Sequence, residues 1–115
     1  MKDSVNMTLL YDYYGQLLTD KQRECFDLYY NQDYSLAEIA AEVGISRQGV
    51  HDSIARAETM LRHMEEKLGC RAREEQLQRA MASIVDAAQQ LSRSDDTLTR
   101  SLAEVILRAA DTIKE

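Results

Sequence analysis

The sequence predicts an all-α protein: a helix-turn-helix bundle followed by a C-terminal helical extension. Two observations predict this class. The chain of 115 residues contains no Pro and only four Gly, a composition that favours long helices over strands joined by turns. Apolar residues also recur three and four positions apart along most of the chain, which is the spacing of one face of an α-helix. We therefore expect a helix-turn-helix domain at residues 1–70 and an extension at residues 71–115 that serves dimerisation or packing.

The first two helices are predicted at residues 5–17 and 20–31. The second follows Thr19, because the sequence Thr-Asp-Lys-Gln can form a capping box in which the side chains of Thr19 and Gln22 accept from each other's backbone N–H groups. Helical spacing assigns these apolar residues to the inward faces: Val5, Leu9, Leu10, Tyr13, Tyr14 and Leu17 in the first helix, and Cys25, Phe26, Tyr29 and Tyr30 in the second.

The next two helices are predicted at residues 36–43 and 47–68, with a tight bend between them. A second capping-box sequence, Ser-Leu-Ala-Glu, begins the shorter helix. Gly44 can adopt the positive φ that ends a helix sharply, Ile45 fills the corner, and Ser46 caps the longer helix. The apolar residues expected inside are Leu36, Ile39, Ala40 and Val43, then Val50, Ile54, Ala57, Leu61, Met64 and Leu68. Two helices joined in this way form a helix-turn-helix.

The extension is predicted to contain two further helices with an apolar residue at every third or fourth position. These residues are Leu77, Met81, Ile84, Ala88 and Leu91, and, after a break at residues 92–96, Leu98, Leu102, Val105 and Ala109. Such a seam favours packing of helix against helix, either within the chain or across a symmetric dimer. We expect a homodimer, because so small an extension buries its seams more fully with a partner. The alternative is a set of three antiparallel helices that pack on themselves.

No catalytic or metal-binding arrangement is visible in the sequence. Cys25 and Cys70 stand far apart, His51 and His63 have no carboxylate or Cys arranged as a triad, and no Gly-rich phosphate loop occurs. We therefore expect neither an enzyme nor a cofactor. No apolar stretch of about 18 residues occurs, and residues 1–6 do not have the pattern of a signal peptide. We expect a cytoplasmic protein without a membrane segment.

The outward face of the helix at residues 47–68 is predicted to bind double-stranded DNA. In a DNA-binding helix-turn-helix, the N-terminal part of the second helix meets base edges in the major groove. Arg47 suits guanine or a phosphate, Gln48 suits adenine, and His51 lies close behind. Asp52 can accept from a cytosine amine or be merely solvated, and the first-turn N–H groups can hold a phosphate. The candidate DNA-binding residues are Ser46, Arg47, Gln48, His51, Asp52 and Arg56.

Three motifs between Leu18 and Leu68 resemble region four of bacterial sigma factors. They are Leu-Thr-x-Lys-Gln-Arg, Ser-Leu-Ala-Glu-Ile-Ala and Gly-Ile-Ser-Arg-Gln-Gly-Val. Together with the Tyr-rich stretch Leu-Tyr-Asp-Tyr-Tyr at residues 10–14, they make residues 5–70 more similar still to the YlxM family of small bacterial helix-turn-helix proteins. This resemblance implies a DNA-binding or regulatory protein whose genes neighbour those of the signal recognition particle.

The charge of the chain departs from the sigma-factor pattern, whose recognition helix is rich in Arg and Lys. The formal net charge is −6, and residues 34–70 contain more acidic than basic side chains. If about three basic side chains reach phosphates, the salt slope is about −2.7, which is weak for a monomer and doubles in a dimer. Two hypotheses follow: dimer-dependent DNA binding, or a helix-turn-helix that docks a basic protein partner in the signal recognition particle pathway.

Overall fold

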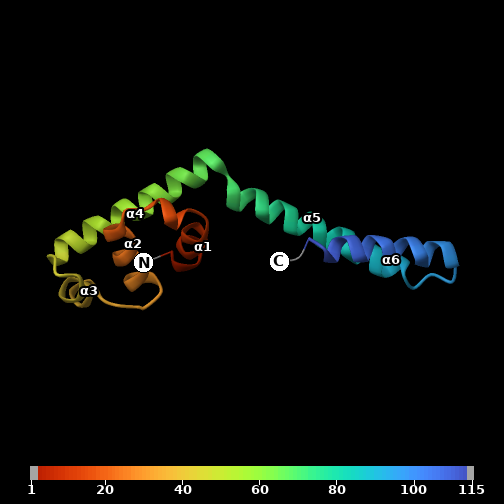
Figure 1. Ribbon diagram of the computed structural model, residues 1–115, viewed down its shortest axis with the longest axis horizontal. Coiled ribbons are helices and arrows are strands. Elements are labelled where there is room, and N and C mark those ends of the chain that lie inside the picture. The colour runs from red at the N-terminus through yellow and green to blue at the C-terminus, as the bar shows by residue number, and fades with distance from the viewer. Residues whose placement is uncertain (1–2, 114–115) are drawn as a thin grey trace. The chain divides into compact units, whose positions relative to one another are not determined.

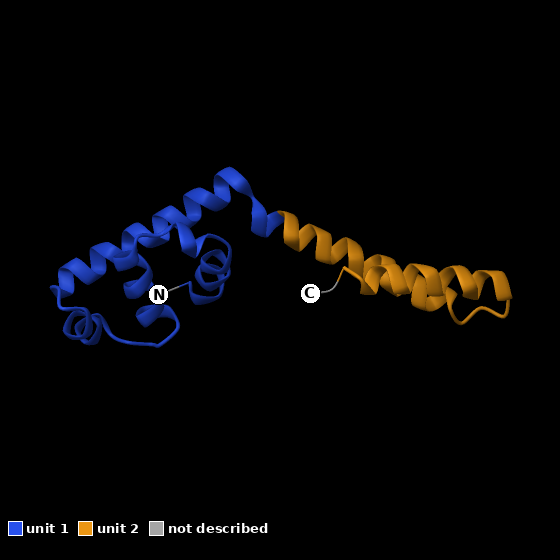
Figure 2. Ribbon diagram, viewed as in Figure 1, with its two compact units in different colours: residues 1–72 blue, residues 73–115 orange. Residues whose placement is uncertain are grey.

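A computed structural model describes residues 3–113 of the chain. Within this range the secondary structure consists of helices and their connections, with no strand, which confirms the all-α class (Figure 1). The elements are α1 (Ser4–Tyr14), the short 3-10 helix η1 (Gly15–Leu17), α2 (Asp20–Tyr30), α3 (Leu36–Val43), α4 (Arg47–Leu68), α5 (Cys70–Leu91) and α6 (Thr97–Asp111). The chain divides into two compact units, residues 1–72 (unit 1) and residues 73–115 (unit 2) (Figure 2).

Unit 1 is organised around α4, against which α1, α2 and α3 all pack. Its core contains large side chains with no exposed surface, namely Met7, Cys25, Phe26, Ile39, Val50 and Leu61. Phe26 stacks on Tyr11 with ring centroids 4.8 Å apart and on Tyr30 at 4.4 Å. Burial of this many aliphatic and aromatic side chains is the main force that holds the four helices together.

Both predicted capping boxes are present. The Gln22 N–H donates to Thr19 Oγ1 at 3.2 Å, and the Thr19 N–H donates to Gln22 Oε1 at 3.1 Å. At the start of α3, the Glu38 N–H donates to Ser35 Oγ at 3.1 Å, and the Ser35 N–H donates to Glu38 Oε1 at 2.9 Å. These bonds fix where α2 and α3 begin, and hence how they meet α4.

The inward face predicted for the first helix is wrong in part. Val5 is 74% exposed, and Tyr13 and Leu17 are also exposed, whereas Met7 and Leu18 are buried together with Leu10 and Tyr14. The cause lies in two pairs of adjacent apolar residues, Tyr-Tyr at residues 13–14 and Leu-Leu at residues 17–18. Either residue of each pair fits the helical spacing, so the spacing does not show which one is buried. The 3-10 turn of η1, followed by the extended conformation of Leu18, accompanies the burial of Leu18 and the exposure of Leu17, and in α1 Tyr14 is the buried member of its pair.

A cluster of hydrogen bonds links α1, the end of α4 and the start of α5. Tyr14 Oη donates to Glu65 Oε1 at 2.6 Å and accepts from the Cys70 N–H at 3.0 Å. The N–H groups of Arg71 and Ala72 donate to the two carboxylate oxygens of Glu65, each at 3.1 Å. The Glu65 side chain therefore caps the N-terminus of α5, because it accepts from backbone N–H groups that the start of a helix leaves without intrahelical acceptors.

Unit 2 is a helical hairpin, because only residues 92–96 separate α5 from α6. Asp96 caps α6 by accepting from the Thr99 N–H at 2.9 Å. The buried residues among those described in this unit are Ala88, Ala103 and Ala110. The seam predicted as one face of α5 is therefore divided: Ala88 is buried and Met81 half-buried, whereas the bulkier Leu77, Ile84 and Leu91 are exposed.

Candidate nucleic-acid interface

The bend between α3 and α4 has the conformation that the sequence predicts. Gly44 ends α3 in the left-handed region, with φ 79° and ψ 34°. The N–H groups of Gly44 and Ile45 both donate to the Ala40 carbonyl, at 2.9 and 3.3 Å. A Cβ added at Gly44 would meet no atom within 4 Å, so the backbone angle, and not lack of space, favours glycine here. Ile45 is half-buried against the core and closes the corner.

Ser46 caps α4, as predicted, and Gly49 makes room for the cap. The Gly49 N–H donates to Ser46 Oγ at 2.9 Å. A Cβ on Gly49 would lie 3.1 Å from the same Oγ, which is tighter than ordinary contact. Helix geometry leaves the N–H groups of Arg47 and Gln48, in the first turn, without intrahelical acceptors. The first turn of α4 thus keeps backbone donors for an anion.

The six candidate DNA-binding residues all lie at the start of α4 and are all exposed. They are Ser46, Arg47, Gln48, His51, Asp52 and Arg56. The opposite face of the helix is buried in the core of unit 1 through Val50, Ile54, Ala57 and Leu61. The structure therefore presents these residues outward on one rigid helix, and their contact with DNA stays a prediction.

Asp52 holds two of its neighbours in place. The Gln48 amide donates from Nε2 to Asp52 Oδ1 at 3.0 Å, and His51 Nδ1 lies 3.4 Å from the same oxygen. The hydrogen bonds from Gln48 and then His51 hold the pKa of the Asp52 carboxyl below its usual range. The sequence suggested a base contact or a merely solvated carboxylate at this position. The structure shows in addition that Asp52 orients Gln48.

The start of α2 lies beside this part of α4 and adds a residue that sequence analysis missed. Lys21 and Gln22 of α2 line a shallow groove together with Gly49, Asp52 and Arg56 of α4. Lys21 is exposed, and the part of the chain that the structure describes gives its side chain no hydrogen bond or ion pair. In the sequence Lys21 is visible only as the Lys of the motif Leu-Thr-x-Lys-Gln-Arg. The packing of α2 on α4 is what brings it next to Arg56.

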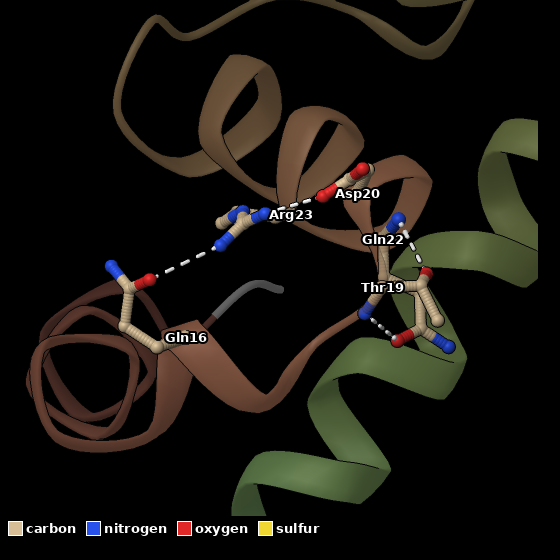
Figure 3. A network of polar contacts seen from close by, with 5 residues as sticks. All are labelled: Gln16, Thr19, Asp20, Gln22 and Arg23. Atoms are coloured by element: carbon tan, nitrogen blue, oxygen red, sulfur yellow. Dashed lines mark hydrogen bonds and ion pairs between the residues drawn. The ribbon is translucent and has the colours of Figure 1, made fainter.

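The side chain of the neighbouring Arg23 is held by residues of α2 and η1, so it is not a candidate for contact with a ligand. Its guanidinium forms an ion pair with Asp20 and donates to Gln16 Oε1 at 3.3 Å (Figure 3). The capping box of Thr19 and Gln22 lies on the same turn of α2. Lys21, Arg47 and Arg56 are therefore the cations that the start of α2 and the outward face of α4 offer to a ligand.

Two acidic residues of unit 1, Glu38 and Glu58, form local hydrogen bonds. Glu38 Oε1 accepts from the Ser35 N–H, and hydrogen bonding to the backbone and then the side chain of Ser35 lowers the pKa of the Glu38 carboxyl. Glu58 accepts from the Tyr30 hydroxyl on the side of α4 that faces α2.

The described residues 3–113 contain no group of three or more His, Cys, Asp or Glu side chains that could hold a metal ion. Cys25 is a buried free thiol, and Cys70 is a half-buried one. Among the helices of that same range, none has both the length and the apolar character needed to cross a membrane.

The sharp bend and the exposed start of α4 define a helix-turn-helix protein. The chain belongs to the UPF0122 family, described as "Putative helix-turn-helix protein, YlxM / p13 like", which matches residues 1–102. This confirms the resemblance seen in the sequence. A UPF0122 protein of Thermoanaerobacter pseudethanolicus is 54% identical over 82 residues, which cover 71% of this chain and 70% of that protein. One from Symbiobacterium thermophilum is 42% identical over 100 residues, covering 87% and 91% of the two chains.

Proposed function

We propose that this protein is a DNA-binding regulator that places the N-terminal turns of α4 in the major groove of double-stranded DNA. The observation that carries the proposal is the exposed, internally ordered group Gln48, His51 and Asp52, at the start of a helix whose other face is anchored in the core. A rigid helix that projects oriented polar side chains is what base recognition requires.

Gln48 is suited to adenine even though it is bonded to Asp52. Its amide nitrogen carries two hydrogens, and only one is needed for the bond to Asp52 Oδ1. The second hydrogen and Oε1 remain for the N7 and N6 groups of adenine, while the bond to Asp52 limits rotation of the amide. Arg47, one residue earlier, would contact guanine or a phosphate, and His51 and Asp52 would lie near the next bases.

The phosphate contacts would come from Lys21, Arg56 and the first-turn N–H groups of α4. Each neutralised phosphate contributes about −0.9 to the slope of log affinity against log salt, so Lys21, Arg56 and an Arg47 that contacts a phosphate together give about −2.7. Binding through one copy would therefore be weak and strongly dependent on sequence-specific contacts.

The test measures, by fluorescence anisotropy, the affinity of the protein for a DNA duplex selected from a random library. The double variant Arg47→Ala, Gln48→Ala is expected to weaken binding at least tenfold, because each well-formed bidentate contact contributes about 1–3 kcal/mol of discrimination. Arg62→Ala is the matched control, since Arg62 is exposed on the same helix but lies about 22 Å further along its axis. Unchanged affinity in the double variant, with helicity preserved, would refute the proposal.

A second candidate is a protein-docking role, which the acidic balance of the chain favours. The formal net charge of −6 suits a basic partner. The family resemblance suggests a component of the signal recognition particle pathway. The tagged protein, purified from cells after nuclease treatment, would then retain a basic protein whose binding survives the Arg47, Gln48 double substitution. Recovery of DNA without such a partner would exclude this role.

A further inference from the structure

The hairpin of unit 2 exposes a set of large aliphatic side chains, here called the apolar face. Its members are Leu77, Ile84 and Leu91 of α5, Leu98, Leu102, Val105 and Ile106 of α6, and Ile113, which follows α6. Each is between 38% and 66% exposed. At about half exposure, eight such residues amount to on the order of 800 Å², which exceeds the roughly 300–600 Å² of the largest apolar patch on a typical monomer.

The apolar face extends across both helices of the hairpin. Leu77 and Met81 of α5 line one groove with Ala110 of α6 and with Ile113. Inside the hairpin, the buried residues among those described are the small Ala88, Ala103 and Ala110, whereas many of the bulkier side chains of both helices are exposed. The hairpin thus buries its small residues and has an uncovered apolar surface formed by larger ones.

Most charged residues of the hairpin lie away from the apolar face, although Glu74 lines the groove beside Leu77. Arg79 and Asp86 each follow a member of the apolar face, Leu77 and Ile84, by two positions in α5, and a two-residue step turns about 200° around a helix. Arg79 is also ion-paired with Glu75 on that outer side.

The same arrangement occurs in α6. Arg100 and Glu104 lie two positions before and after Leu102, and Glu104 and Arg108 lie two positions before and after Ile106. Between residues 76 and 91, and at Arg100 and Glu104 of α6, the charges therefore stand on the side of each helix opposite to the exposed aliphatic residues, whereas Arg108, three positions after Val105, lies at the edge of the face. Amphipathic helices separate their apolar and polar sides in this way.

We propose that a second copy of this chain covers the apolar face, so that two hairpins form a four-helix bundle across a two-fold axis. Three observations favour a second copy over another partner. Its members are uncharged aliphatic side chains, and Glu74 is the one charged residue among those lining the groove, so the face lacks the charge that would select an oppositely charged protein. Its spacing of seven in α5 (Leu77, Ile84, Leu91) suits packing against a like helix. Its area matches the about 800 Å² that each partner contributes to a standard interface.

The proposed dimer does not depend on DNA binding, but it would change how strongly DNA binding depends on salt. A dimer carries two copies of α4 and doubles the number of cationic phosphate contacts, which would change the salt slope from about −2.7 to about −5.4. Because the assembly can be measured without DNA, failure of one proposal leaves the other testable by itself.

The test is the mass of the full-length chain in solution, measured by light scattering and sedimentation equilibrium without DNA. The wild-type protein is expected at twice the 13.2 kDa of one chain. The double variant Ile84→Asp, Leu102→Asp is expected at the monomer mass with unchanged helicity, because both positions are already exposed in the single hairpin and tolerate a carboxylate there. The matched control Gln89→Asp, Thr97→Asp adds the same charge at exposed positions outside the apolar face and should remain dimeric.

Thermal unfolding gives a second readout that does not rely on the substituted chains having the right mass. The midpoint of a dimer rises with protein concentration, so wild type and control should show this dependence and the Ile84, Leu102 variant should lose it. A wild-type mass of 13.2 kDa at tens of micromolar would overturn the proposal. So would a dimer that survives the Ile84, Leu102 double substitution, or a monomer that binds lipid vesicles or a different protein through this face.

Discussion

In unit 1 the largest side chains are the most buried, whereas in unit 2 the smallest are. Phe26 and Leu61 have no exposed surface, but the buried positions described in unit 2 are all alanines, and Leu98 is 66% exposed. Both units are made of amphipathic helices with similar spacing of apolar residues. Helical periodicity therefore identifies which residues form an apolar face, but not whether the chain itself buries that face.

The number of helices around each seam explains the difference. In unit 1, α4 is contacted by three other helices, so a wide stripe of its surface is enclosed. In unit 2, α5 has only α6 beside it, and a pair of helices can cover no more than one narrow stripe of each. An exposed apolar surface as large as the one that remains on unit 2 is typical of an interaction site, which is why we propose that a second copy covers it.

The largest expected effect tests the core of unit 1. Phe26→Ala should lower the free energy of unfolding by about 3–5 kcal/mol, because it removes a fully buried ring and the stacking with Tyr11 and Tyr30. Denaturation in urea, followed by circular dichroism, measures the loss. Leu17→Ala is the control, since Leu17 is 59% exposed and should change stability by less than about 0.5 kcal/mol. A loss below about 1 kcal/mol for Phe26→Ala would mean that unit 1 is not better packed than unit 2.

A smaller effect is expected at the cap of α4. Ser46→Ala should destabilise unit 1 by about 1 kcal/mol, because the Gly49 N–H loses its acceptor. Ser101→Ala, in the exposed middle of α6, should change stability by only a few tenths of a kcal/mol. Urea denaturation compares the two serines directly. Equal effects at the two positions would contradict the capping role of Ser46.

The parts of the fold that the sequence predicted well depend on residues close together in the chain. The capping boxes at Thr19 and Ser35, the αL conformation of Gly44 and the cap at Ser46 each involve groups no more than four positions apart. Their physics is local, so the order of residues is enough to identify them. The outward position of the candidate DNA-binding residues followed in the same way, from the apolar stripe of the helix that carries them.

The parts that the sequence did not predict depend on packing between helices. The position of Lys21 beside Arg56 requires that α2 lie next to α4. The bond from Tyr14 to Glu65 joins residues 51 positions apart. The split of the α5 seam into buried Ala88 and exposed Ile84 requires knowing where α6 sits. Spacing along one helix contains none of this information.

The smallest expected effect concerns pH and the cap that Glu65 provides where α5 begins. Burial alone would raise the pKa of Glu65, but the hydrogen bonds from Tyr14, Arg71 and Ala72 outweigh it, and the net pKa is lowered. A carboxyl whose pKa is lower in the folded than in the unfolded state stabilises the fold above the unfolded pKa. That stabilisation is lost as the pH falls through the folded pKa, so the cap should loosen below about pH 4.5.

Hydrogen exchange of the Arg71 and Ala72 amides, followed by NMR and corrected for intrinsic rates, measures the opening of this cap. In the wild type, protection should fall as the pH drops from about 6 to about 3. In Glu65→Gln it should be lower at pH 6 and nearly independent of pH, because the carboxamide neither titrates nor accepts as strongly. Glu66→Gln, which removes the adjacent exposed carboxylate, should behave like the wild type. If Glu66→Gln instead abolished the pH dependence, the loss of protection would reflect the general charge of this helix end and not the bonds that Glu65 makes to Tyr14 and to the start of α5.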